Sequence, residues 1–409
     1  MPLVPALHFS FSWFALPLLA AGWLVSAHQV LAGAIHPAVE GLSDVHGMDI
    51  VVGNGELYAL LVGKFAQLGG GMAVAYLVSR DGGQRWSRPL FLNRGDEAPP
   101  MSRRGNDARL ALAGSRLLAV WQARGELPGA GPMRIAVSGD GGKTWREGAN
   151  PAAGDASRNQ SYMAVAADAG GRFHLAWLDD REENGNSQGL HHASSRNGGS
   201  HWTAETTVDP EVCTCCWNRL LALPDQSLAL LYRDSEPHDM RLSRLPSGGT
   251  AWRDQGPVGI SGWHFSGCPH CGGGLAATGR AGKAVLHGLT WTGKDNTAGL
   301  YYSRSGDYGR HWSSPFFLGD SRHKESDIAA RASGEVAIVY THATSLGSPL
   351  YWLHSRDQGR HWSKPSALTA PDAKADHPRV IATDKGFRAF WTESREGGGK
   401  SWTMAVPSL

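Results

Sequence analysis

The chain has 409 residues, of which 41% are hydrophobic, 9% aromatic and 19% charged. It is therefore long enough to bury the core of one large domain or of two smaller ones, and its charge is too sparse for a disordered chain. The 39 Lys and Arg residues nearly balance the 37 Asp and Glu residues, giving a net charge of +2. This balance argues against a nucleic-acid-binding surface, which needs clustered basic residues. Glycine, with 53 residues, is more frequent than in an average protein. Together with the 16 Trp residues, this frequency favours a turn-rich all-β protein.

The first 34 residues contain no Asp, Glu, Lys or Arg, and residues 9–25 are almost wholly apolar. The A-x-A sequence at residues 32–34 predicts a secretory signal peptide, residues 1–34, that is cleaved after Ala34. The alternative is an uncleaved membrane anchor, because residues 9–25 have about the minimum length that can span a bilayer. In either case we expect residues 35–409 to be extracytoplasmic, periplasmic or secreted, with the membrane touched only through the N-terminal segment.

One motif is repeated along the chain with identical internal spacing, S-x-[DN]-x-G-x-x-W. Five copies begin at Ser79, Ser138, Ser195, Ser305 and Ser355, and two worn copies end at Trp252 and Trp402. The Asp or Asn side chain can accept hydrogen bonds from the backbone of a turn, and the Gly can adopt a positive φ. The Trp can then pack as an apolar plug between neighbouring sheets.

The motif resembles the Asp box of the sialidase and BNR-repeat β-propellers, and the resemblance extends from about residue 46 to the C-terminus. It implies a single all-β propeller domain, residues 35–409, built from four-stranded antiparallel blades. We count seven repeat units of about 53 residues each, with the six blades of sialidases as the alternative. The first strands of the units are expected at residues 49–52, 109–113, 162–166, 218–223, 275–277, 327–330 and 379–382. The last unit stops after its third strand, so residues 36–42 are expected to supply its outer strand.

The segments that precede these first strands are polar and rich in metal-binding side chains. Each segment occupies the same position in its repeat unit, so all of them should lie on one face of the propeller. That face would carry all five cysteines together with His46, His270, His323 and His377. The loops that join the second and third strands reach the same face, and they add charged residues such as Asp179, Arg233 and Glu236.

The cysteines form two clusters in successive units, so we expect them to be neighbours in space. One interpretation is that one or two disulfides join these units, as is usual in exported proteins. A second is a thiolate site for copper or zinc, and a third is a redox-active dithiol. Neither C-x-x-C is followed by the His that covalent haem needs. The candidate metal ligands are Cys213, Cys215, Cys216, Cys268, His270 and Cys271.

The resemblance also implies a retaining glycosidase, with three arginines that bind a substrate carboxylate, a Tyr–Glu nucleophile pair and an Asp acid. Arg109, Arg219 and Arg379 share one phase of the repeat and are the candidate arginines. The alternative is that each pairs with a local carboxylate, such as Asp107 or Asp376. The Arg-Ile-Pro signature of the family is missing, and no Tyr with a convincing Glu partner can be assigned.

The chain is similar as well to bacterial sialidase-like proteins that carry a C-x-C-C-W stretch, a Tyr-Arg-Asp segment and a Cys-Pro-His stretch. Here these stretches are residues 213–217, 232–234 and 268–270.

The sequence therefore favours a binding or accessory role for an exported propeller. Its ligand would be a small molecule, a glycan or a metal, bound at the funnel mouth, that is, on the face that carries the cysteines. A protein partner would fit the same role. The first alternative is an exo-sialidase or a related glycoside hydrolase. The second is a scaffold subunit of a membrane complex, which requires that the leader is retained.

Overall fold

The computed structural model describes residues 34–93, 98–127, 129–155, 157–181 and 187–408. The predicted leader thus lies outside the described residues, except for Ala34. The described residues all belong to one compact unit. Within the described ranges the regular structure is β-strand, apart from one turn of 3-10 helix at Ala66–Leu68. No helix in these ranges is long and apolar enough to cross a membrane.

The strands form seven antiparallel sheets, which we number as blades 1 to 7 in chain order. Blade 1 contains β1 (Leu42–Gly53), β2 (Glu56–Phe65), β3 (Gly71–Ser79) and β4 (Leu90–Phe91). Blade 2 contains β5 (Pro100–Met101), β6 (Arg109–Ala113), β7 (Arg116–Ala123), β8 (Met133–Ser138) and β9 (Arg146–Glu147). Blade 3 contains β10 (Gln160–Ala167), β11 (Phe173–Asp179), β12 (Ser187–Ser195) and β13 (Thr206–Cys213). Blade 4 contains β14 (Arg219–Ala222), β15 (Leu228–Arg233), β16 (Met240–Leu245) and β17 (Arg253–Pro257).

The remaining blades continue the same order. Blade 5 contains β18 (Gly274–Thr278), β19 (Val285–Thr292), β20 (Gly299–Ser305) and β21 (Phe316–Asp320). Blade 6 contains β22 (Ser326–Ala330), β23 (Val336–Thr341), β24 (Leu350–Ser355) and β25 (Ser366–Ala367). Blade 7 contains β26 (Ala375–Thr383), β27 (Gly386–Ser394) and β28 (Lys400–Ala405). The expected seven units are therefore seven blades, including the two units with worn motifs.

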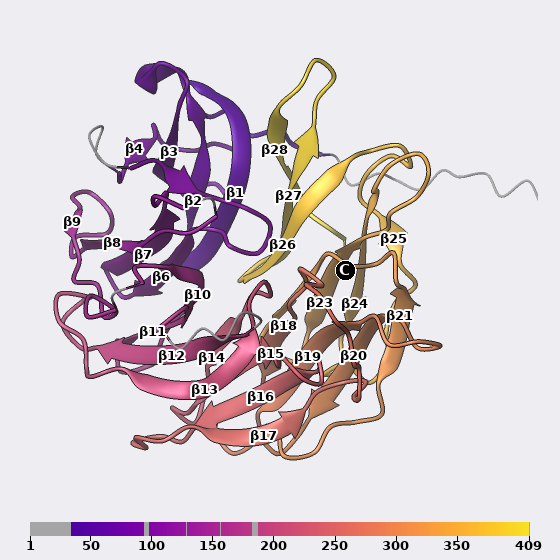
Figure 1. The fold of residues 1–409 in the computed structure, drawn as a ribbon. Coiled ribbons are helices and arrows are strands. Elements are labelled where there is room, and N and C mark those ends of the chain that lie inside the picture. Colours follow the sequence, from indigo (N-terminus) through magenta and orange to yellow (C-terminus); the bar gives the residue numbers. More distant parts are fainter. Residues whose placement is uncertain (1–33, 94–97, 128, 156, 182–186, 409) are drawn as a thin grey trace, which may run out of the picture. The chain divides into compact units, whose positions relative to one another are not determined.

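The blades close into a ring through their first strands. Each first strand contacts the first strand of the next blade, and β26 of blade 7 contacts β1 of blade 1. Figure 1 shows the blades following one another around the ring in chain order, so that the yellow strands lie beside the indigo ones. All seven first strands expected from the sequence overlap the observed ones, and the expected strand at residues 109–113 coincides with β6.

Burial explains which residues form the middle of each blade. The second strands are nearly continuous apolar runs, and β11, β15 and β23 are buried at every residue. A strand that is covered on both faces has such a continuous apolar sequence, because neither of its faces is exposed to water. The outermost strands β4, β9 and β25 are only two residues long, and such short edges limit unwanted pairing with other chains.

The repeated motif forms the turn between the third and fourth strands, as the sequence predicts. In blade 2, the Ser138 hydroxyl donates to Asp140 Oδ1 at 2.8 Å and accepts the Gly142 N–H at 2.9 Å. Gly142 has a φ of 84°, which few other residues adopt without strain. The Trp145 ring packs 5.0 Å from Tyr76 of blade 1, so the motif Trp fills the space between two blades.

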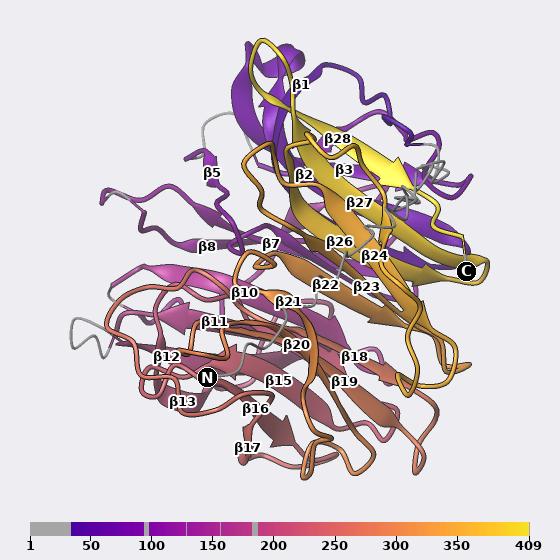
Figure 2. The same cartoon turned by 90° about the vertical axis from the view of Figure 1, so that its right-hand side faces the viewer.

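The ring is closed by pairing between the two ends of the described chain. Ile35 forms an antiparallel bridge with Met404 of β28, with N···O distances of 2.7 and 2.8 Å in the two directions. The sequence placed this pairing in residues 36–42, but the pairing residue is Ile35, just before that segment. The last residue of the segment, Leu42, already belongs to β1. Figure 2 shows the strands of blade 7 next to β1 and β2, where this closure takes place.

Candidate functional site

The loops that enter the first strands carry polar side chains to the centre of the ring. The pairing register shifts between Val45 and Gly47 in β1, and again between Asp376 and Arg379 in β26. In blade 2, β5 and β6 both pair with β7, so residues 102–108 leave the sheet as an excursion. At these bulges, charged side chains can point away from the apolar interior of the blade while the strands stay paired on either side.

The three arginines predicted to bind a carboxylate are held by carboxylates of the protein itself. Arg379 Nη2 donates to Asp107 Oδ2 at 3.0 Å, and Arg109 Nη2 lies 3.8 Å from the same oxygen. Arg219 donates to Asp327 of blade 6. The second oxygen of Asp327 accepts the Val380 N–H of blade 7 at 3.0 Å. Arg379 therefore joins blade 7 to blade 2, and Arg219 joins blade 4 to blade 6, whereas Arg109 pairs within its own blade.

A second set of charged side chains lies beside these arginines, and we call the two sets together the axial charge cluster. Arg104 pairs with Glu325, and His377 Nδ1 lies 3.3 Å from Asp376 Oδ2. Burial, together with the nearby Asp376 carboxylate, raises the pKa of Glu325 to about 7. Burial lowers the pKa of His377, but the carboxylates of Asp376 and Asp107 outweigh it and raise the pKa above its usual value.

The narrow cavity between Asp107, Arg109, Glu325 and Arg379 is too small for a sugar, but two cavities of about 550 and 390 Å³ share lining residues with it. Both of these larger cavities are lined by Arg104 and Asp376. The narrow cavity has a volume of about 30 Å³. A single water occupies about this volume in the liquid. A Tyr–Glu hydrogen bond of 2.9 Å does exist, from Tyr58 to Glu56, but neither residue lines this cavity. The narrow cavity at Arg109 and Arg379 therefore has no room for a sugar ring.

The cysteines of the C-x-C-C segment meet at the junction of blades 3 and 4. Cys213 ends β13, and the chain then passes through Cys215 and Cys216 into β14. The Cys213 sulfur lies 3.7 Å from the Cys215 sulfur and 2.9 Å from the Cys216 sulfur, and the last two are 4.0 Å apart. All three are buried, and none of the five cysteines forms a disulfide in this structure.

The second cysteine segment contributes two more groups to the same place. The ligand atoms of Cys215, Cys268 and His270 lie within 4.8 Å of one another, as do those of Cys213, Cys215 and Cys216. Cys215 thus belongs to both groups. The three residues of the C-x-C-C group are buried, whereas Cys268 and His270 are exposed. His270 has a φ of 48°, which is uncommon for a residue with a side chain.

The sixth predicted ligand, Cys271, lies outside both groups. Its sulfur contacts the carbonyl oxygens of Lys324 at 3.4 Å and Gly272 at 3.5 Å. Burial raises the pKa of Cys271 to about 11. Cys271 is therefore a protonated thiol that donates to backbone oxygens.

A large cavity gives solvent access to the thiols. Its volume is about 700 Å³, which falls in the range of ligand pockets. Cys213, Cys268, His238, His264 and Phe265 are among the residues that line it. The sequence analysis did not single out His264 and Phe265. Their position next to the Cys-Pro-His-Cys stretch was the available signal.

The C-x-C-C loop is fixed by the packing of Trp217. A Cβ on Gly105 would lie 2.2 Å from the Trp217 ring, and Gly105 has a φ of 79°. Gly272 is equally close to Trp217, because a Cβ there would lie 2.2 Å from its carbonyl oxygen. Glycine is thus required where blades 2 and 5 approach this loop, and the sulfur positions follow from that packing.

The charge around the thiols favours an anion on Cys216. Burial opposes ionisation, but hydrogen bonds from the thiols of Cys213 and Cys215 and the charge of Arg233 lower the pKa of Cys216 well below its usual value. The pKa of Cys215 is raised by its hydrogen bonds with the other two sulfurs.

Two further polar clusters are structural. Asp320, His323 and His342 bring three ligand atoms within 4.8 Å. However, the two rings are stacked at 4.2 Å and 11°, so their in-plane lone pairs do not converge, and Arg322 holds Asp320 at 2.7 Å.

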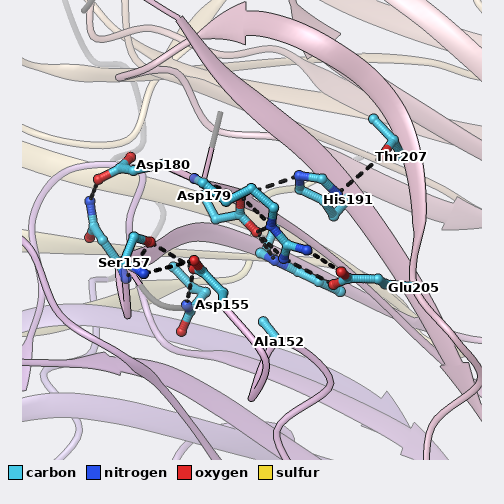
Figure 3. Close-up of polar contacts among 12 residues, drawn as sticks. Ala152, Asp155, Ser157, Asp179, Asp180, His191, Glu205 and Thr207 are labelled. Carbon is cyan, nitrogen blue, oxygen red and sulfur yellow. Dashed lines mark hydrogen bonds and ion pairs between the residues drawn. The ribbon is translucent and has the colours of Figure 1, made fainter. Parts of the chain in front are cut away.

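In blade 3, Asp179 is fully buried and accepts hydrogen bonds from Trp177 and Arg181 at 3.0 Å. Figure 3 shows Asp179 beside His191, whose Nδ1 is 3.4 Å from the Thr207 hydroxyl. Arg181 also reaches Glu205 at 3.0 Å. The Asp179 carboxylate therefore links β11, the loop after it and β12.

The fold and the cluster define a seven-bladed, Asp-box β-propeller with a thiol-rich junction between blades 3, 4 and 5. The chain belongs to the family described as BNR repeat-like domain, whose profile matches residues 115–388. A comparison with curated proteins finds no match.

Several solved structures share the fold. An ulvan lyase has a TM-score of 0.60 and 11% identity, covering 90% of this chain and 94% of the lyase. The K499G mutant of the NanB sialidase of Streptococcus pneumoniae has a TM-score of 0.50 and 11% identity, covering 90% of this chain and 70% of the sialidase. The Trypanosoma rangeli sialidase has a TM-score of 0.51 and 11% identity, with coverages of 89% and 55%. At these identities the similarity shows the sialidase-like propeller fold alone.

Proposed function

We propose that this protein is an extracytoplasmic metal-binding propeller that holds a soft ion, Cu(I), at the thiols between blades 3, 4 and 5. The observation that carries the proposal is the pair of three-ligand groups that share Cys215. Thiolate and imidazole are ligands that Cu(I) and Zn(II) both accept. Each group supplies three ligands, one fewer than a closed structural zinc site uses, and this favours Cu(I).

The sulfur spacing is compatible with a bound ion. With metal–sulfur bonds of 2.3 Å, the sulfurs of a tetrahedral or trigonal site are about 3.8–4.0 Å apart. The distances from Cys215 to Cys213 and Cys216, 3.7 and 4.0 Å, match this spacing. Only the contact of 2.9 Å between Cys213 and Cys216 would have to open, by about 1 Å.

The difference in exposure supports a division of roles between the two groups. Cys268 and His270 face solvent and would meet an incoming ion first. Cys215 can serve either group, while Cys213 and Cys216 would retain the ion away from water. A binding role of this kind fits an accessory protein that acquires or hands over a metal.

The test is an anaerobic titration of the reduced protein with Cu(I) against a chromophoric chelator, together with a count of free thiols and elemental analysis. Cys215→Ala should abolish binding because it removes a ligand from both groups. Cys271→Ala is the matched control, since Cys271 is a buried cysteine outside both groups, and it should leave binding intact. A wild-type protein with about one free thiol and no metal would instead favour two structural disulfides.

A further inference from the structure

The outer edge of blade 5 differs from the outer edges of blades 1 to 4 and 6. Its outermost strand, β21, is five residues long and begins with Phe316, Phe317 and Leu318. The outermost strands β4, β9 and β25 are shorter, and β13 and β17 each contain a proline and an acidic residue. Short length, proline and charge all protect a sheet edge from pairing with another chain. In β21 only the last residue, Asp320, is charged, and among the described strands β21 pairs only with β20.

Two phenylalanines of this strand are exposed beside a large cavity. Phe316 is 49% exposed and Phe317 is 53% exposed. Both line a cavity of about 710 Å³ between blades 5 and 6, together with Tyr302 of β20 and Trp362 of the turn motif of blade 6. This volume falls in the range of ligand pockets. Exposed aromatic side chains that lie together at such a cavity favour an interaction site over an ordinary surface.

The cavity is also positively charged. Its lining contains Arg304, Arg360 and His361, and the described residues that line it include no Asp or Glu. His361 is paired with Asp357, which lies outside the lining, and Arg360 donates to the backbone carbonyl of Asp357 at 3.1 Å. Within the described ranges, however, neither Arg304 nor Arg360 forms an ion pair with a carboxylate. Both guanidinium groups can therefore bind a carboxylate that a ligand brings.

We infer that the open edge of β21 and the cavity beside it form a docking site for an acidic, extended segment of a partner protein. Such a segment would add a strand to blade 5 through backbone hydrogen bonds. Its apolar side chains would pack on Phe316 and Phe317, and its carboxylates would pair with Arg304 and Arg360. The positive charge of the cavity argues against a second copy of this chain, because a two-fold contact would bring the same cationic surface together with itself. The inference is independent of the proposed function, since none of the candidate metal ligands lines this cavity.

The test is a fluorescence-polarisation titration of the full protein with a labelled peptide in which Glu and Val alternate. This peptide should bind, whereas a peptide with Lys in place of Glu should not. Methylating the backbone amides of the Glu–Val peptide should weaken binding at least about 10-fold, because it removes the donors that an added strand needs. Arg304→Ala combined with Arg360→Ala should cause a loss of similar size.

The matched control is Arg310→Ala. Arg310 occupies the same position in the motif of blade 5 as Arg360 does in the motif of blade 6, but it lies outside the cavity. Its substitution should leave the affinity for the peptide unchanged. Circular dichroism at the titration temperature verifies that each variant is folded.

Three results would overturn the inference. The first is that the Glu–Val peptide does not bind, or that Arg310→Ala weakens binding as much as the double variant. The second is a dimer in sedimentation that Phe317→Glu dissociates, which would make a second copy the occupant. The third is displacement of the peptide by a heparin fragment with no effect of amide methylation, which would indicate an anionic glycan instead. None of these results bears on the titration with Cu(I).

Discussion

Replacing Asp107 by Asn should be the most informative test of the axial charge cluster. Asp107 is 2% exposed, and it faces Arg379 at 3.0 Å, Arg109 at 3.8 Å and His377 at 3.7 Å. Asparagine preserves the volume but removes the negative charge that separates two buried guanidinium groups. Breaking a buried ion pair by removing one partner costs about 3–5 kcal/mol.

The expected change in melting temperature follows from the size of the domain. At about 2.1 cal/mol/K per residue, roughly 375 residues have an unfolding entropy near 0.8 kcal/mol/K. The Asp107→Asn variant should therefore melt about 4–6 °C below wild type. Adding Arg379→Gln to Asp107→Asn should recover part of this loss, because it removes one of the two unpaired cations.

Calorimetry and guanidinium unfolding would measure both effects. The control is Asp372→Asn, since Asp372 is exposed and its substitution should change the unfolding free energy by less than about 0.5 kcal/mol. If Asp107→Asn also shifts stability by less than 1 kcal/mol, the arginines do not depend on this carboxylate. Arg109 and Arg379 would then not need Asp107 as their partner, whereas Arg219 would still pair with Asp327.

Three further predictions concern the turn motif, the pH response and ring closure. Ser138→Ala removes the acceptor of the Gly142 N–H and should lower the unfolding free energy by about 1–2 kcal/mol, measured by chemical denaturation. Because burial raises the pKa of Glu325 from 4.5 to about 7, wild type should lose stability as the pH rises from 4.5 toward 7. In Glu325→Gln this part of the loss should disappear, as thermal melts across that pH range would show. Ile35→Pro removes the hydrogen bond that the Ile35 N–H donates to the Met404 carbonyl but keeps the acceptor of the Met404 N–H. Because the weakened bridge opens more often, the Met404 amide should exchange faster with solvent than in Ile35→Ala.

The repeat made most of the fold predictable from sequence. Because the spacing S-x-[DN]-x-G-x-x-W marks the same turn in each blade, the first strands could be located by counting, and β6 was predicted to the residue. The start of β1 was not, because Ser43, Asp44 and His46 interrupt the apolar pattern although this segment pairs with β2.

The site was only partly predictable, because its partners come from distant blades. The phase of the repeat correctly placed Cys213, Cys215, Cys216, Cys268 and His270 together. The orientation of Cys271 could not be inferred, since it depends on Lys324, which is 53 residues further along the chain. Likewise, nothing in the sequence indicates that Arg219 pairs with Asp327.

The closure of the ring has a consequence for the order of folding. Ile35 and Met404 lie near opposite ends of the described chain. The last strand of blade 7, β28, is paired on its outer edge only when these two residues form their bridge. Contacts between residues so far apart in sequence form slowly, because a long loop must be closed before they stabilise anything. Blades 1 to 6 can each form from consecutive residues, whereas blade 7 is complete only after Ile35 pairs with Met404. We therefore expect an open-ring intermediate whose exposed β28 edge is the part of the molecule most prone to pair with another chain.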